Sequence, residues 1–148
     1  MTEKARRRVA ILYHGGQEAR RDATPETSKV PKIFPALAAL GVDAIPVVYN
    51  DDFRAEVLRQ LLEVDGVLVW VNPIEGGRDR SELDALLREV AAAGVFVSAH
   101  PDVILKLGTK EVLYRTRDIG WGSDTHLYSS MDEMRRELTA RYCFRTRA

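Results

Sequence analysis

The sequence predicts an α/β domain built on an open, mostly parallel four-stranded sheet with helices on both faces. Short apolar runs and amphipathic helical patterns alternate four times along residues 9–98, with short connections between them. This alternation is typical of β-α-β units, in which consecutive strands run parallel. Several runs are apolar throughout, as expected for strands that are covered on both faces. A chain of 148 residues that is 45% hydrophobic is long enough to bury such a core.

The limits of the elements follow from where the apolar patterns start and stop. The predicted strands are Val9–Tyr13, Asp43–Tyr49, Gly66–Val71 and Val95–Ser98. The predicted helices are about Val30–Leu40, Phe53–Val64 and Glu82–Ala93. Polar stretches at Gln17–Ser28 and Ile74–Arg80 are predicted as loops, and Pro35 is expected to delay or kink the first helix. One of the aspartates Asp51 and Asp52 is predicted to cap the second helix.

The chain after the fourth strand is predicted to hold shorter elements. A helical pattern stops at Gly120, an extended segment follows at Thr125–Tyr128, and a last helix spans about Met131–Ala140. We therefore expect an α/β domain at residues 1–120 and a short strand and helix tail at 121–148.

Composition excludes several classes of function. Lys and Arg together number 22, as do Asp and Glu, so we expect no general affinity for nucleic acid. The single cysteine, Cys143, excludes an intramolecular disulfide and a multi-cysteine zinc site, and it fits a reducing cytoplasm. No apolar run approaches the roughly 20 residues that span a bilayer. The charged residues 1–8 are followed by no apolar run of signal-peptide length. We expect a cytoplasmic protein without a membrane partner.

Polar residues and glycines follow the predicted strands, where a site would form. In an open parallel sheet, ligands bind outside the carboxyl ends of the strands, next to the point where strand order reverses. The candidate ligand-binding residues at these ends are His14, Gly15, Gly16, Asn72, Glu75, Ser98 and His100. The sequence therefore predicts a site for a small-molecule or nucleotide ligand.

Each candidate also has an ordinary structural explanation. The glycines after His14 could present backbone amides to an anion, but a plain tight turn is favoured, since the spacings of the dinucleotide and phosphate-loop motifs are absent. A metal or acid-base role for His14 and His100 lacks a third ligand at a recognisable spacing. Ordinary polar loop histidines are therefore favoured, and no metal site is predicted.

Lys110 is a separate candidate, for nucleotide binding. It follows Gly108-Thr109 and is predicted to lie in the first turn of a helix, where the helix dipole disfavours a lysine and favours an anion. The alternative is a lysine on a solvated helix face, which is the usual place for this residue type. Both interpretations remain open on the sequence.

The segment from Val95 to Tyr128 resembles the place in ATP-grasp proteins where the N-terminal domain meets the nucleotide-binding domain. The shared order is a strand, a loop with a lysine, a helix, a glycine stop and a second strand. ATP-grasp proteins typically carry an Asp-Lys pair at the start of that helix and a Gly-(Ile/Val)-Pro-like step after it. In this chain the pair is Thr109-Lys110 and the step is Gly120-Trp121-Gly122, so the aspartate and the proline are missing.

The resemblance implies a Rossmann-like pre-ATP-grasp domain in which Lys110 reaches toward the nucleotide phosphates. The reaction of the family is ATP-dependent ligation of a carboxylate to an amine or a similar nucleophile, with ATP and magnesium as cofactors. The glycine-rich loop and magnesium ligands of the family come later than the region of resemblance, and no residue here can be assigned to them. We therefore expect an N-terminal domain or fragment that is not catalytic alone.

A different class of function remains open beside this one. The same strand ends would serve a free-standing flavodoxin-like or Rossmann-like module that binds a small anion or has a regulatory role, because one such fold hosts many functions. Apolar residues of the C-terminal segment also need a partner, which predicts either a homodimer or a frayed terminus. These residues are Leu127, Tyr128, Met131, Met134 and Leu138.

Overall fold

The structure is a computed structural model that describes residues 7–72, 74–75, 78–108, 110–120 and 124–141. Its chain forms two compact units, Met1–Val103 and Ile104–Ala148. The predicted boundary at residue 120 stays a prediction, since compactness alone does not define a domain.

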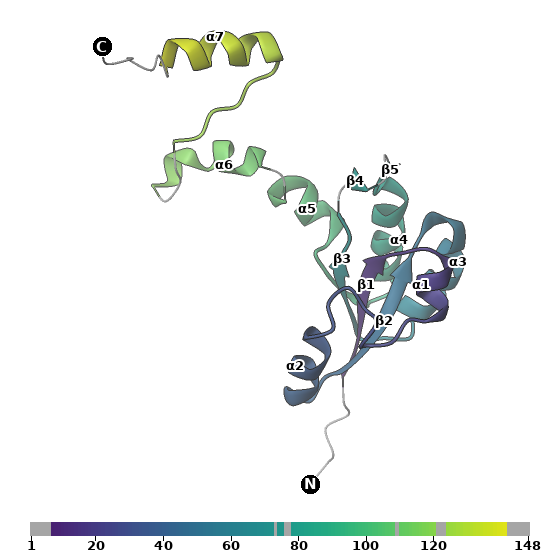
Figure 1. The fold of residues 1–148 in the computed structure, drawn as a ribbon. Helices are drawn as coiled ribbons and strands as arrows, with labels where there is room; N and C mark the ends of the chain where they lie inside the picture. The colour runs from purple at the N-terminus through teal and green to yellow at the C-terminus, as the bar shows by residue number, and fades with distance from the viewer. Residues whose placement is uncertain (1–6, 73, 76–77, 109, 121–123, 142–148) are drawn as a thin grey trace. The chain divides into compact units, whose positions relative to one another are not determined.

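A four-stranded sheet forms the centre of the first unit (Figure 1). Its strands are β1 (Arg8–His14), β2 (Asp43–Tyr49), β3 (Gly66–Trp70) and β6 (Phe96–Ser98). They lie in the order β2-β1-β3-β6, and every neighbouring pair is parallel. The predicted α/β class with a parallel four-stranded sheet is therefore confirmed.

The strand order fixes where the sheet changes direction. From β1 the chain moves to β2 on one side, and β3 then lies on the opposite side of β1. The switch point is therefore between β1 and β3, as in the flavodoxin-like type of doubly wound sheet. Val9 of β1 is paired with Ala44 of β2 and with Gly66 of β3, so the three strands are aligned along their length.

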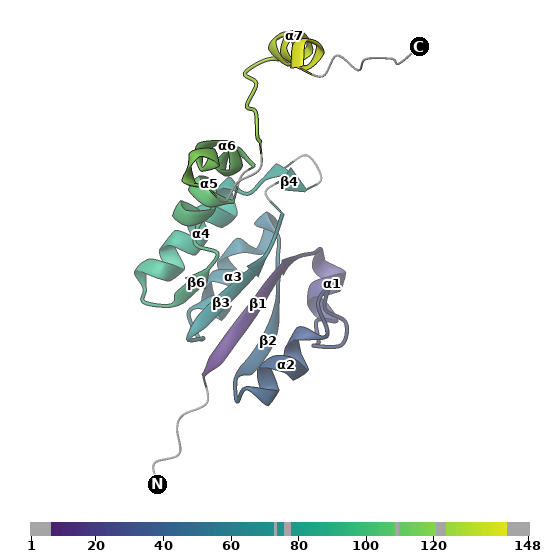
Figure 2. The same ribbon diagram turned by 90° about the vertical axis from the view of Figure 1, so that its left-hand side faces the viewer.

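Helices cover both faces of this sheet, as predicted. They are α1 (Gln17–Arg21), α2 (Ile33–Ala39), α3 (Arg54–Leu61) and α4 (Ser81–Ala92), with a 3-10 turn, η1 (Asp51–Phe53), before α3. Figure 2 shows α1 and α2 on one side of the sheet and α3 and α4 on the other. Three consecutive residues of β1, Ala10 to Leu12, are fully buried because each face of the central strand is covered.

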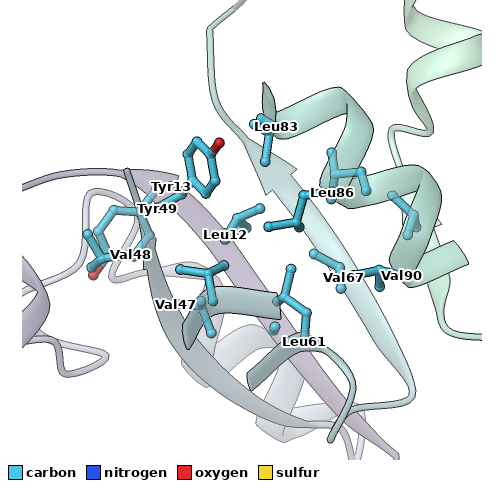
Figure 3. Packing of buried hydrophobic residues seen from close by; sticks show 14 of the residues in the cluster. Leu12, Tyr13, Val47, Val48, Tyr49, Leu61, Val67, Leu83, Leu86 and Val90 are labelled. Carbon is cyan, nitrogen blue, oxygen red and sulfur yellow. The ribbon is translucent and has the colours of Figure 1, made fainter. Parts of the chain in front are cut away.

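The largest part of the core lies between the sheet and the pair α3 and α4 (Figure 3). Leu12 and Val67 from the sheet are buried there together with Leu61 from α3 and Leu86 from α4, and each of the four is 0% exposed. Each such side chain contributes about 1.5 to 3 kcal/mol of burial free energy. The apolar positions of α4 thus pack into the core, as its amphipathic pattern predicted.

Two helices begin at places that differ from the prediction. Residues predicted as a loop contain α1, a single turn with Glu18 near its start and two arginines near its end, which suits the helix dipole. Its Arg20 guanidinium lies over the Phe53 ring, 4.5 Å from the centroid. A tertiary contact therefore supports a turn too short to be stable alone. Helix α2 begins at Ile33, later than predicted, with Pro35 in its first turn.

The cap before α3 is also different from the prediction. The Asn50 Oδ1 accepts a hydrogen bond from the Asp52 N–H across 3.2 Å, and both aspartates lie inside η1. The prediction that Asp51 or Asp52 is the cap was wrong by one or two residues, because any of three adjacent polar side chains could start this turn.

The segment after β3 contains a short antiparallel pair in place of the predicted loop. Its strands are β4 (Ile74–Glu75) and β5 (Arg78–Asp79), and Ile74 is paired with Asp79. Two-residue strands carry too few residues for a periodic pattern, so sequence analysis missed them.

Helices make up the described secondary structure after β6. They are α5 (Pro101–Leu107), which spans the boundary between the units, α6 (Glu111–Arg115), the 3-10 turn η2 (Arg117–Ile119) and α7 (Met131–Arg141). Gly120 ends η2 at φ 84°, which confirms the predicted glycine stop. The predicted strand at Thr125–Tyr128 is not formed, and a strand would need a neighbour to hydrogen-bond with. Leu127 and Met131 are exposed, and the predicted homodimer stays a prediction.

Candidate functional site

A small pocket lies at the carboxyl ends of β1, β2 and β3. Its lining residues are His14, Tyr49, Asp51, Val71, Asn72, Asp79, Arg80 and Leu83. The register of the sheet explains why these segments meet. His14 at the end of β1 is paired with Tyr49 of β2, and Tyr13 is paired with Trp70 of β3. The pocket is therefore next to the switch point, where the fold predicts a ligand. Its inner volume of about 20 Å³ has room for one water-sized group.

A buried ion pair forms one wall of this pocket. Arg80 precedes the first residue of α4, and its Nε donates to Asp84 Oδ1 across 2.7 Å. Its Nη1 donates to the Val71 carbonyl oxygen across 3.3 Å, which ties the end of β3 to the start of α4. Arg80 is 8% exposed and Asp84 is 5% exposed, so each charge depends on the other for compensation.

One nitrogen of the same guanidinium has no hydrogen-bond partner in the described part of the chain. The Nη2 atom of Arg80 is buried and makes no hydrogen bond to any described residue. Buried polar groups are nearly always hydrogen-bonded, so an unmade bond on a buried charged group needs an explanation. The Arg80 side chain lines the pocket, while its Nη2 atom is itself closed off from solvent.

Tyr49 and Asp51 form a second polar contact in the pocket. The Tyr49 hydroxyl donates to Asp51 Oδ1 across 2.7 Å. Burial raises the pKa of the Tyr49 phenol well above its ordinary 10.0, and the hydrogen bond and charge of Asp51 raise it further. Tyr49 is therefore a neutral hydrogen-bond donor at physiological pH, held in place by a carboxylate.

The start of α4 is held by the neighbouring Asp79. Its Oδ1 accepts from the Ser81 hydroxyl across 2.6 Å and from the Ser81 N–H across 2.9 Å. These two bonds favour the ionised form and lower the pKa of the exposed Asp79 carboxyl. The pocket thus has a second carboxylate at its rim.

The structure brings two of the predicted strand-end residues into this pocket. His14 and Asn72 line it, whereas Gly15 and Gly16 lie just outside its lining. The Gly15 N–H donates to the Tyr49 carbonyl oxygen across 3.0 Å, and Gly16 precedes α1. Both glycines serve the turn after β1, so no anion is needed to explain them.

Ser98 and His100 are outside the pocket lining, and Glu75 cannot be placed relative to it. Ser98 ends β6 and does not line the pocket. His100 Nδ1 accepts from the Asp102 N–H across 3.2 Å, which gives this ring a local structural role. Glu75 lies in β4, and its side chain is outside the described residues.

Lys110 belongs to the second unit. It lies at the N-cap position of α6, a helix of five residues, and is exposed. The predicted place of Lys110 at the start of a helix is confirmed, and its binding role stays a prediction.

Sequence analysis missed the most informative residue of the pocket, Arg80. A signal for it was present, since Arg80 and Asp84 have opposite charges at an i, i+4 spacing and Asp84 directly follows the buried Leu83. A carboxylate on the apolar side of an amphipathic helix indicates a buried partner. Tyr49 and Asp51 were recognised as strand-end residues but not as binding residues.

A larger cleft lies at the opposite end of β2, with a volume of about 470 Å³. Its lining residues are Pro25, Glu26, Pro31, Phe34, Pro35, Ala38, Val42, Asp43 and Ala44. The Asp43 carboxylate there pairs with Arg8 across 3.4 Å. We favour the smaller pocket as the site because polar groups from several segments converge in it, whereas the larger cleft is mainly an apolar surface.

Comparisons of the chain with protein-family models, with curated proteins and with solved structures found no match. Function therefore has to be argued from the site itself. Among the described residues, no group of three or more His, Cys, Asp or Glu side chains is placed to hold a metal ion. The described helices include none with the length and apolar character needed to cross a membrane.

Proposed function

We propose that the first unit binds a small polar metabolite at the carboxyl ends of β1 and β3. The observation that carries this proposal is the pocket at the switch point, where a buried arginine, Arg80, lies with a tyrosine, an asparagine and two aspartates. Doubly wound sheets bind their ligands at this place because two crossovers leave it in opposite directions and open a crevice.

We propose further that this unit is the ligand-binding domain of an ATP-grasp-type ligase. Support comes from the order of elements after β6, in which Lys110 precedes a short helix and Gly120 ends the turn that follows. In such a ligase the first unit would hold a substrate, while ATP and magnesium would bind mainly to a nucleotide-binding domain. The chain alone would then bind ligand without catalysing ligation.

A free-standing binding or regulatory module is the second candidate. The observation that favours it is that the pocket and the core beneath it lie within the first unit, so ligand binding needs no second domain. The two candidates differ in the expected role of Lys110. In an ATP-grasp domain Lys110 should contact the nucleotide phosphates, whereas a free-standing module does not require this contact.

Amide NMR spectra of the full chain, recorded against a panel of small metabolites, test the proposed function. A ligand at the switch point should shift the amides of His14, Asn72 and Ser81, while Val9 and Asp43 at the other end of the strands serve as internal controls. A panel in which no compound shifts the strand-end amides, or in which every effect falls on the control end, would reject the proposal.

A further inference from the structure

We propose that the ligand of the small pocket at the carboxyl ends of β1, β2 and β3 is a neutral polyol, such as a sugar, recognised by the exposed side chains of Asn72 and Asp79. One hydroxyl group of the polyol enters the pocket, and the hydroxyl on the next carbon atom stays at its mouth. This inference rests on the proposed function, namely that the pocket binds a small polar metabolite. It adds the chemical class of that metabolite and the two residues that select it.

Asn72 and Asp79 are the exposed polar residues of the pocket lining that keep polar atoms available. The Asn72 amide makes no side-chain hydrogen bond to any residue that the structure describes. Asp79 uses its Oδ1 atom for both bonds from Ser81, and its Oδ2 atom accepts none from the described part of the chain. A ligand can therefore bond to an amide and to a carboxylate oxygen without breaking a hydrogen bond of the fold.

The Asp79 carboxylate is held in place before any ligand arrives. Its residue is paired with Ile74 in the β4–β5 pair, and the two bonds from Ser81 fix its side chain at the start of α4. An acceptor that is already fixed loses little conformational entropy on binding. The same bonds lower the pKa of the carboxyl, so Asp79 is ionised at neutral pH and is a strong acceptor for a hydroxyl donor.

The charges of the lining argue against an ionic group in the pocket. Arg80 brings a positive charge to one wall, and Asp51 and Asp79 bring negative charges. An inserted anion would lie beside the carboxylates, and an inserted cation would lie beside the guanidinium, so either ion meets a like charge. A hydroxyl group has no net charge and both donates and accepts hydrogen bonds, which suits a lining of this kind.

The dimensions of the pocket set the size of the inserted group. The inner volume of about 20 Å³ has room for one water-sized group. A hydroxyl group has this size, whereas a carboxylate or a carboxamide group is larger. The rest of the ligand then lies outside, where a hydroxyl on the adjacent carbon atom can donate to Asp79 and exchange a hydrogen bond with the Asn72 amide. Adjacent hydroxyl groups of this kind are the common feature of sugars and cyclitols.

Titrations of the full chain with D-ribose, D-glucose and myo-inositol, followed by amide NMR, test this inference. Cyclohexanol, cyclohexylammonium and cyclohexanecarboxylate are the comparison ligands, because they have the carbon ring of inositol but carry a single hydroxyl or a single charge. We expect at least one polyol to shift the amides of Asn72 and Ser81 to saturation. Each comparison ligand should bind about tenfold more weakly or less, since it loses at least one hydrogen bond to a charged group.

Substitutions at the pocket mouth test the two residues. Asp79→Asn keeps an oxygen for the bonds from Ser81 and removes the negative charge, whereas Asn72→Ala removes the amide. Both positions are exposed, so the melting temperature should hardly change. We expect the polyol to bind about tenfold more weakly to Asp79→Asn and about fivefold more weakly to Asn72→Ala. Asp22→Asn is the matched control and should bind normally, because Asp22 is exposed and does not line the pocket.

The outcomes separate this inference from the proposed function. If a comparison ligand binds as tightly as the polyols, the polyol class is rejected, and unchanged polyol affinity in both folded variants rejects the roles of Asn72 and Asp79. In either case the pocket would still be a ligand site. Binding of other metabolites at the strand ends without any polyol effect also rejects this inference alone. If no compound of either kind shifts these amides, both proposals fail.

Discussion

Arg80 and Asp84 face each other across one turn at the start of α4, with 2.7 Å between Nε and Oδ1 and both side chains buried. Because Arg80 also bonds the Val71 carbonyl, this pair fixes the end of β3 against the helix that follows it. The same arginine lines the candidate pocket. Structure and ligand binding are therefore expected to depend on one side chain, and the two roles have to be separated by experiment.

Arg80→Ala should destabilise the fold strongly. Removal of one partner of a buried ion pair leaves an uncompensated charge at Asp84, which costs about 3 to 5 kcal/mol. Urea denaturation followed by circular dichroism measures the loss in the free energy of unfolding. The double variant Arg80→Met with Asp84→Leu should lose much less, and equal losses in the two proteins would contradict this account of the pair.

Gly15→Ala should destabilise the turn after β1. A Cβ at this position would lie 2.8 Å from Val48 Cγ1, and Val48 is buried and has little room to move. Overpacking of this kind costs about 1 to 3 kcal/mol. The neighbouring Gly16→Ala is the control, because a Cβ there meets nothing within 4 Å. Thermal unfolding of both variants checks the prediction, which fails if the two melting temperatures are lowered equally.

Tyr49 should make stability sensitive to alkaline pH. Burial raises its pKa in the folded state above the ordinary 10.0, so above about pH 10 the unfolded chain releases a proton that the folded chain keeps. The contribution of the Tyr49 hydroxyl to the free energy of unfolding is complete below pH 10 and is lost as the pH rises toward the folded-state pKa. Tyr49→Phe should cost about 1.5 kcal/mol at neutral pH through the lost bond to Asp51.

The difference between wild type and Tyr49→Phe is the quantity to follow with pH. In urea denaturation series from pH 8 to pH 11, this difference in the free energy of unfolding should become smaller. Above about pH 10, ionisation of Tyr49 stabilises the unfolded wild type, and Tyr49→Phe has no phenol to ionise. Tyr13 is also buried with a raised pKa, but it is present in both proteins and cancels in the comparison. A difference that stays constant up to the highest pH would show that Tyr49 ionises as an ordinary tyrosine.

Lys110→Ala distinguishes the two candidate functions. In an ATP-grasp domain its loss should weaken ATP binding in the presence of magnesium by about ten- to a hundredfold, the equivalent of one charge-assisted contact. The melting temperature should hardly change, since Lys110 is exposed. Calorimetric titration measures the affinity, with Lys106→Ala, an exposed lysine of α5, as the control. ATP binding that is equal in wild type and Lys110→Ala would favour the free-standing module.

Elements with a strong local pattern were predicted well from the sequence. The strand at Asp43–Tyr49 has the predicted limits, and α4 differs from its prediction by one residue at each end. Short elements were not predicted, since α1 and the β4–β5 pair have too few residues for a period to show. The extended segment at Thr125–Tyr128 was predicted as a strand although no local pattern can supply the neighbour that a strand requires.

The sequence by itself determined the class of the fold and the end of the sheet where a site belongs. Both follow from local patterns, because alternating strands and helices impose a parallel sheet and the residues after each strand must gather at its carboxyl edge. Only the tertiary structure decided which of those residues meet. The order β2-β1-β3-β6 placed His14 and Asn72 in one pocket, and packing of α4 on the sheet buried Arg80, one nitrogen of which has no partner among the residues that the structure describes. Burial and hydrogen bonding of a single side chain depend on contacts between distant segments, which local sequence patterns do not encode.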